Sequence, residues 1–262
     1  MRVLILGTLF VILALLFLLP VLVVFIEGLS KGWKAYVASF SDPTTQSAIW
    51  LTLKVAAFAI PLNTAFGLAA AWCVARFQFR GRRLLTLLIE LPLWVSPIIS
   101  GLIFVLLFGA QGVLGPWLKE HDIKIIFAVP GIVLSTIFVT FPFVARVITP
   151  LMESHGQNEE EAALTLGANG WQTFRYVTLP KIKWGLLYGI ILCNARAMGE
   201  FGAVSVVSGH IRNKTNTLPL HIEVLYNEYK FVPAFAVASL LLLLAAVTLG
   251  LHAIIERKTQ RN

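Results

Sequence analysis

Two ionisable side chains stand four residues apart in a stretch that otherwise suits a lipid environment. The sequence ILCNARAMGEFGAVSVVSG, at residues 191–209, holds Arg196 and Glu200 among apolar and small residues, together with Asn194 and Ser205. Residues four apart share one face of a helix and can pair. Charges inside a membrane are costly, and they usually face protein or a water-filled cavity. Two interpretations stay open: this face lines an anion path, or the pair neutralises itself and holds neighbouring helices in register.

A second polar stretch, NEEEAALTLGANGWQTFRYVTLPKIKWG at residues 158–185, has helix signals but is too polar to insert into a membrane. Its three consecutive glutamates place negative charge at a helix start, where the helix dipole favours it. Gly167, or the Asn-Gly pair at 169–170, can adopt the left-handed conformation that ends a helix and turns the chain. We expect a second short helix at residues 171–177, ended by Pro180. The stretch therefore predicts a compact helix-turn-helix.

The composition indicates which kind of protein positions these groups. The chain has 262 residues, of which 58% are hydrophobic and 13% charged, and its mean hydropathy is +0.82. A soluble domain would carry more charge, and about 20 apolar residues suffice for a helix to cross the hydrocarbon layer. We expect an all-α polytopic membrane protein, with residues 1–262 forming one transmembrane domain. Six spans are expected at residues 3–26, 48–75, 84–110, 125–148, 184–207 and 232–255. Asp42 and Pro43 supply a cap and first-turn proline for the second span.

The distribution of Lys and Arg predicts the orientation of these spans, because cytoplasmic segments carry the excess of these residues. The richer set holds Arg2, Arg76, Arg80, Arg82, Arg83, Arg146, Arg175, Lys181, Lys183, Arg257, Lys258 and Arg261. The poorer set holds Lys31, Lys34, Lys119, Lys124, Arg212, Lys214 and Lys230. Both termini and the segment at 149–183 should therefore face the cytoplasm. The net charge of +8 follows from this bias and does not call for a nucleic-acid partner.

The segment at 161–180 resembles the cytoplasmic signature of binding-protein-dependent ABC importer permeases. That signature reads Glu-Ala-Ala, three residues, Gly, nine residues, an aliphatic residue, one residue, and Leu-Pro. The matching residues are Glu161, Ala162, Ala163, Gly167, Val177, Leu179 and Pro180. Val177 replaces the commoner isoleucine. The resemblance implies the MetI-like permease fold, in which this segment docks on an ATP-binding subunit and transmits its closure to the spans.

The chain has no G-x-x-x-x-G-K-[ST] loop to hold phosphates. The resemblance therefore implies that two partner ATPase subunits bind ATP and Mg, and that this chain binds no cofactor and is not itself an enzyme. The five histidines and two cysteines show no metal-ligand spacing, so we expect no metal site.

A further resemblance narrows the family. The run Gly-Glu-Phe-Gly-Ala at 199–203 is similar to the fifth span of the sulfate and molybdate branch. The run SGHIRNKTNTLPLHIEVLYNEY at 208–229 looks closest to the CysW-type sulfate/thiosulfate subfamily. This implies a subunit of a bacterial-type inner-membrane importer for sulfate, and also thiosulfate, working by alternating access. Its partners would be a second, related permease subunit, the two ATPase subunits, membrane lipid and a periplasmic binding protein. Candidates for an outer gate or a contact with that binding protein are Arg212, Lys214, Thr215, Asn216 and Thr217.

Three alternatives remain open at this point. Molybdate and tungstate are also tetrahedral dianions, and no residue in the sequence indicates which size of anion is selected. An ion-coupled transporter acting alone would have no use for the segment at 161–180. A membrane enzyme would need paired carboxylates or a nucleophile and base at the mouth of the bundle, and the sequence shows neither.

Overall fold

The computed structural model describes residues 2–259, without the side chains of residues 2–5, 252 and 254–259; Arg261, which counts toward the basic C-terminal segment, lies outside this range. All regular structure in the described part is helical. Four of its helices are long and apolar enough to cross a membrane. They are α1 (Arg2–Leu29), α3 (Pro43–Arg76), α7 (Val129–His155) and α13 (Phe231–Thr259).

Two further pairs of helices are long and apolar enough only when each pair is taken together, and each pair is bent at a short break. The segment expected as one span at 84–110 is divided into α4 (Arg82–Trp94) and α5 (Pro97–Phe108), which meet at 108°. The residue before a proline is disfavoured in the α region, and Ser96, which precedes Pro97, has an extended ψ of 134°. The segment at 184–207 is likewise divided into α10 (Leu179–Met198) and α11 (Gly202–Ser208), bent by 49°.

Helices α3, α7 and α10 form the centre of the molecule and pack closely together. Glycines permit this approach: a Cβ added at Gly67 of α3 would lie 2.8 Å from the Cβ of Val144 on α7. Ile148 and Met152 of α7 and Ile182 of α10 complete a buried apolar cluster between these helices. Small residues at such contacts are typical of membrane helices, because lipid tails supply no hydrophobic drive and close packing must stabilise the contact instead.

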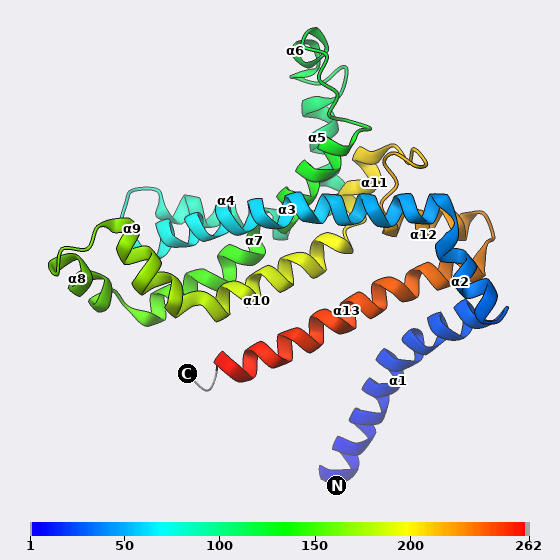
Figure 1. Cartoon of the computed structure of the whole chain (residues 1–262), viewed down its shortest axis with the longest axis horizontal. Coiled ribbons are helices and arrows are strands. Elements are labelled where there is room, and N and C mark those ends of the chain that lie inside the picture. Colours follow the sequence, from blue (N-terminus) through cyan, green and yellow to red (C-terminus); the bar gives the residue numbers. More distant parts are fainter. Residues whose placement is uncertain (1, 260–262) are drawn as a thin grey trace.

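Helices α3, α7 and α10 run roughly along the long axis of the molecule and give it two distinct ends (Figure 1). The C-terminal ends of α3 and α7 lie together with α8 (Asn158–Thr165) and α9 (Gly170–Thr173). The opposite end holds α2 (Trp33–Ser41), α12 (Leu218–Asn227) and the start of α3. Helix α5 projects sideways from the bundle and carries α6 (Gly115–Glu120) at its tip. Helix α1 touches α13 near Gly28 and then diverges from it.

Local signals at the helix ends gave one confirmed prediction and one that was wrong. Asp42 caps α3 as expected, because its side chain accepts a hydrogen bond from the backbone N–H of Thr45. Pro180 was expected to end the short helix that starts near Trp171, and it does not. The chain stays helical from α9 through the π-helical η1 (Phe174–Thr178) into α10. Pro180 lies in the first turn of α10, and the π-helical turn before it takes the usual form of π-helices, a short insertion within a longer helix.

Candidate functional site

The predicted helix-turn-helix is present at one end of the bundle. Helix α8 has the three glutamates at 159–161 in its first turn. Gly167 takes φ +90°, the left-handed turn that the sequence predicts. Asn169 then caps α9 in a reciprocal capping box with Gln172, each side chain bonding the backbone N–H of the other at 2.8 Å. Both ends of this turn are therefore specified locally.

The outer face of this segment is apolar and open. Glu161, Ala162 and Gly167 are exposed, and Ala163 is half-buried. Leu164, Leu166 and Trp171 also project outward, and the Leu166 side chain is 88% exposed. Exposed apolar residues of this kind are typical of surfaces that contact another protein or a membrane, and a contact with the ATPase stays a prediction. We call the set Glu161, Ala162, Leu164, Leu166, Gly167 and Trp171 the docking face.

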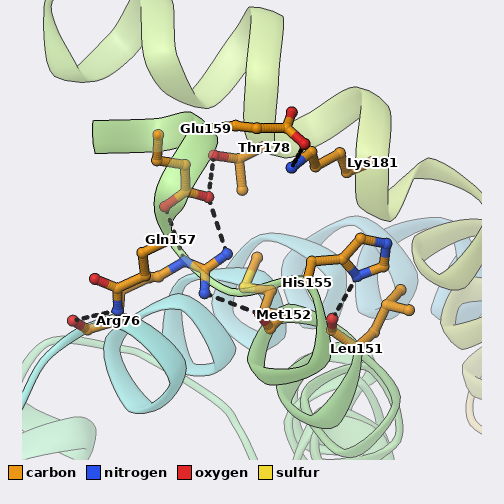
Figure 2. A network of polar contacts seen from close by, with 9 residues as sticks. Arg76, Leu151, Met152, His155, Gln157, Glu159, Thr178 and Lys181 are labelled. Carbon is orange, nitrogen blue, oxygen red and sulfur yellow. Dashed lines mark hydrogen bonds and ion pairs between the residues drawn. The ribbon is translucent and has the colours of Figure 1, made fainter. Parts of the chain in front are cut away.

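The inner side of α8 is held by a polar junction rather than by apolar packing, since no residue of α8 is fully buried. Arg76, the last residue of α3, donates a hydrogen bond from Nη2 to Glu160 Oε1 at 3.0 Å (Figure 2). Its Nε lies 2.9 Å from Oε2, an ion-pair contact without the alignment of a hydrogen bond. Its Nη1 donates to the carbonyl of Met152 in the last turn of α7, at 2.8 Å. Thr178 of η1 donates its hydroxyl to Glu160 Oε1, at 2.8 Å.

The electrostatics of this junction are favourable on every side. The side chains of Arg76 and Glu160 are only 8% and 13% exposed, so water screens their attraction weakly. Arg76 lies at the C-terminal ends of α3 and α7, where the helix dipole favours a cation. Glu160 lies in the first turn of α8, where the dipole favours an anion. Two contacts lie outside the junction: Gln157 Nε2 donates to the carbonyl of Arg76, and the exposed Glu159 pairs with Lys181 at 2.6 Å.

Arg76 and Glu160 were not singled out from the sequence. The family signature begins at Glu161 and directs attention to the next residue along. Helical geometry could have indicated that one of the glutamates faces the bundle, because consecutive residues on a helix point about 100° apart. Three glutamates in a row therefore cannot all face solvent on a helix that lies against the bundle.

Of the last residues of the signature, Leu179 packs against the bundle and Pro180 does not. Leu179 is half-buried against the apolar cluster that includes Met152 and Ile182. Pro180 is exposed in the first turn of α10. Val177 is half-buried on η1. These residues join the docking face to α10 rather than belonging to it.

The structure brings Arg196 and Glu200 together and leaves Asn194 and Ser205 apart from them. Arg196 Nη2 and Glu200 Oε2 lie 2.9 Å apart. The Ser205 hydroxyl donates to the carbonyl of Gly202 within its own helix, at 2.8 Å. Asn194 is half-buried on α10. A role for these four residues in an anion path stays a prediction.

The five outer-gate candidates divide into two groups. Arg212 and Lys214 are exposed, whereas Thr215, Asn216 and Thr217 are buried. The buried three lie against the bundle, so in this conformation they do not form a surface that a partner could touch. The sequence alone does not separate the exposed members of this group from the buried ones.

Beside this loop a cavity of about 500 Å³ opens between α2, the start of α3 and α12, lined by Asp42, Thr45, Arg212, His221, Glu228 and Lys230 among others. Glu228 pairs with both Arg212 and Lys230. His221 is buried, and its Nε2 is hydrogen-bonded to Thr45 Oγ1 at 3.0 Å. Burial lowers the pKa of His221, partly offset by the charge of Asp42. The hydroxyl of Thr44 lowers the pKa of Asp42.

Comparison with known proteins identifies the class to which this arrangement belongs. Residues 63–261 match the family described as "Binding-protein-dependent transport system inner membrane component". The chain belongs to this family. The permease is 49% identical over 249 residues to the sulfate transport system permease protein CysW of Escherichia coli K12, covering 95% of its own length and 86% of the relative. It is 37% identical over 237 residues to CysT of the same organism, covering 90% and 86%.

The fold comparison agrees. The permease superposes on a chain of the bacterial alginate ABC transporter, solved in complex with an alginate pentasaccharide-bound periplasmic protein, with a TM-score of 0.78 over 99% of this chain and 93% of that one. At 18% identity this likeness concerns the fold alone. The predicted all-α importer permease fold, the multi-pass membrane class and the resemblance to the CysW type are confirmed. The permease is a membrane subunit rather than an enzyme.

Proposed function

We propose that this permease is a transmembrane subunit of an ATP-driven importer that moves sulfate, and also thiosulfate, into the cytoplasm by alternating access. The observation that supports the coupling role is the docking face, a rigid helix-turn-helix that exposes Glu161 and Gly167 at one end of the bundle. The anion is inferred from the relatives, since CysW and CysT are both sulfate permeases.

The assembly follows from the same features. Because Escherichia coli K12 holds both a CysW and a CysT relative of this chain, the second permease subunit is expected to be related but different. Two ATPase subunits would bind ATP and Mg, and one of them would receive the docking face. A periplasmic sulfate/thiosulfate-binding protein would deliver the anion at the opposite end, where Arg212 and Lys214 are exposed. Thr215, Asn216 and Thr217 would then act as buried parts of an outer gate.

Orientation is part of the proposal. The end that holds α8 would face the cytoplasm of a bacterial-type inner membrane, with both termini on that side. The distribution of Lys and Arg supports this orientation, because cytoplasmic segments carry the excess of these residues. The connection from α3 to α4, which lies at the α8 end, holds Arg76, Arg80, Arg82 and Arg83.

Uptake tests this function. A strain lacking its own permease should regain sulfate uptake when this chain is supplied with its partner subunits. Glu161→Lys and Gly167→Asp should insert at normal levels but fail to retain the ATPase on purification. Rescue of molybdate uptake alone would refute the sulfate assignment. Normal sulfate uptake by both variants would refute the coupling role of the docking face.

A further inference from the structure

We propose that Arg76 and Glu160, rather than the signature residue Glu161, fix α8 to the membrane bundle, so that displacement of the docking face is passed directly to α3 and α7. This inference rests on the proposed function, because it assigns the route by which motion of an ATPase enters the spans. Arg76 and Glu160 act here as positioning residues, since neither is expected to touch the transported anion.

Other contacts hold α8 too weakly to transmit force. None of its side chains is fully buried, so α8 lacks the apolar packing against neighbouring helices that stabilises most short helices. The Glu159–Lys181 pair lies toward solvent, with the Glu159 side chain 68% exposed, and exposed pairs contribute little. The Arg76–Glu160 pair is the deeper attachment.

The geometry of the pair suits a mechanical link. The guanidinium is planar and is held at two points, by Nη2 on Glu160 and by Nη1 on Met152, so it restricts the angle as well as the distance between α8 and the bundle. The carboxylate also receives the hydroxyl of Thr178. The Arg76 guanidinium and the Glu160 carboxylate together therefore join α3, α7, α8 and η1 (Figure 2).

Helix α3 can carry such a displacement across the whole molecule. It has 34 residues and so spans about 51 Å at 1.5 Å per residue. Near its far end Thr52 accepts a hydrogen bond from the backbone N–H of Leu218 at 2.8 Å, and Thr45 is bonded to His221. The same helix thus contacts α8 at one end and α12 beside the outer loop at the other.

Glu161 has the complementary role. It is exposed on the docking face, and within the described part of the chain it makes no ion pair or side-chain hydrogen bond. Neighbouring residues on a helix point about 100° apart. Glu160 therefore faces the bundle, and Glu161 stays available to another protein.

The test uses the full importer, with both permease subunits, two ATPase subunits and the binding protein, reconstituted in lipid vesicles. Three quantities are measured: retention of the ATPase on purification, ATP hydrolysis stimulated by sulfate-loaded binding protein, and sulfate taken up per ATP hydrolysed. The variants are Glu160→Gln, Arg76→Lys and Arg76→Met, with Glu159→Gln as the matched control on the same turn.

Glu160→Gln should retain the ATPase, because the docking face is intact, while sulfate uptake per ATP falls about tenfold, the factor expected on losing a hydrogen bond to a charged group. Arg76→Met should behave in the same way. Arg76→Lys keeps the charge but not the planar geometry, so its loss should be intermediate. Glu159→Gln should stay within about twofold of the unmodified complex, because its pair is exposed.

If Glu160→Gln fails to accumulate, two variants that each remove a single hydroxyl test whether the junction transmits motion. Thr178→Val removes one hydroxyl from the junction, whereas Thr149→Val removes one that bonds only within α7. Uptake per ATP should fall in the first and not in the second. Unchanged coupling in Glu160→Gln with the ATPase bound would overturn the inference, as would loss of the ATPase from that variant. An unmodified complex that binds no ATPase would instead overturn the proposed function, and this inference with it.

Discussion

Arg196 and Glu200 form an ion pair across the bend that separates α10 from α11, with Nη2 and Oε2 2.9 Å apart. The other carboxylate oxygen of Glu200 accepts a hydrogen bond from the backbone N–H of Ala203, at 3.0 Å. One carboxylate therefore holds the end of α10 and the start of α11 together. This geometry supports the interpretation of the pair as structural. An additional role of Arg196 toward an anion stays a prediction.

The unequal burial of this pair predicts an unequal response to substitution. The Glu200 side chain is 1% exposed and that of Arg196 is 36% exposed. Arg196→Met leaves a buried carboxylate without its partner, which costs about 3 kcal/mol of unfolding free energy. Glu200→Gln keeps an acceptor for both Ala203 and Arg196 and leaves no buried carboxylate unpaired, so it should cost about 1 kcal/mol. Thermal unfolding of the purified protein in detergent measures both, and the reverse order would contradict the structural role.

Two glycines of the docking segment form a matched pair for the second prediction. A Cβ at either Gly167 or Gly170 would meet open space, but only Gly167 has positive φ, at +90°. Gly167→Ala should therefore strain the turn by about 1–2 kcal/mol, whereas Gly170→Ala should be neutral.

Retention of the ATPase on purification, at equal membrane levels of each variant, measures the result. We expect weaker retention for Gly167→Ala alone. Equal retention in both variants would show that the shape of this turn is irrelevant to docking.

The third prediction concerns pH. Burial lowers the pKa of His221 below its ordinary value of 6.5, although the charge of Asp42 opposes the shift. Below about pH 6.5 the unfolded chain therefore binds a proton that the folded chain does not, and stability falls as the pH falls. Above that pH both states are neutral at this position and the contribution is flat. The lowered pKa of Asp42 adds a loss in the same direction at lower pH, below its ordinary 3.8.

His221→Gln removes this titration and can keep a hydrogen bond to Thr45. The slope of unfolding midpoint against pH between 5 and 6.5 should therefore decrease in this variant, by up to the equivalent of about 1.4 kcal/mol per pH unit. His155→Gln is the control, because His155 is exposed at the other end of the molecule. The seven tryptophans provide a fluorescence readout. A His221→Gln protein with the original slope would contradict the assignment.

These features show which parts of the molecule could be predicted from sequence. Signals contained in a few neighbouring residues were reliable: the Asp42 cap, the acidic start of α8 and the left-handed Gly167 all depend on local backbone geometry. Hydropathy also located the apolar segments, because the length needed to cross a membrane is fixed. It could not show that the segment at 84–110 bends by 108°, since a broken helix and a straight one have the same composition.

Features that depend on distant residues were missed. Glu160 gains its role from Arg76, which lies far away in the sequence and on another helix. Thr215, Asn216 and Thr217 look like a solvated loop, yet packing against the bundle buries them. Pro180 was read as a helix end because a π turn, which lets the helix continue into α10, has no simple sequence signal.

The buried loop gives the last prediction. Asn216 is 4% exposed, and neither its Nδ2 nor its Oδ1 has a hydrogen-bond partner in the described part of the protein. An unsatisfied buried amide costs about 1–3 kcal/mol, and replacing it with an apolar group of similar volume removes that cost.

Asn216→Leu should therefore leave stability unchanged or raise it, unlike most substitutions at buried positions. If Asn216 belongs to an outer gate, the same variant should slow sulfate uptake, because it favours the conformation in which this side chain is buried. Lys214→Ala, which changes an exposed neighbour, should leave the unfolding midpoint unchanged. A loss of more than about 1 kcal/mol in Asn216→Leu would mean that the amide is satisfied in the folded protein, and the gate would then need another residue.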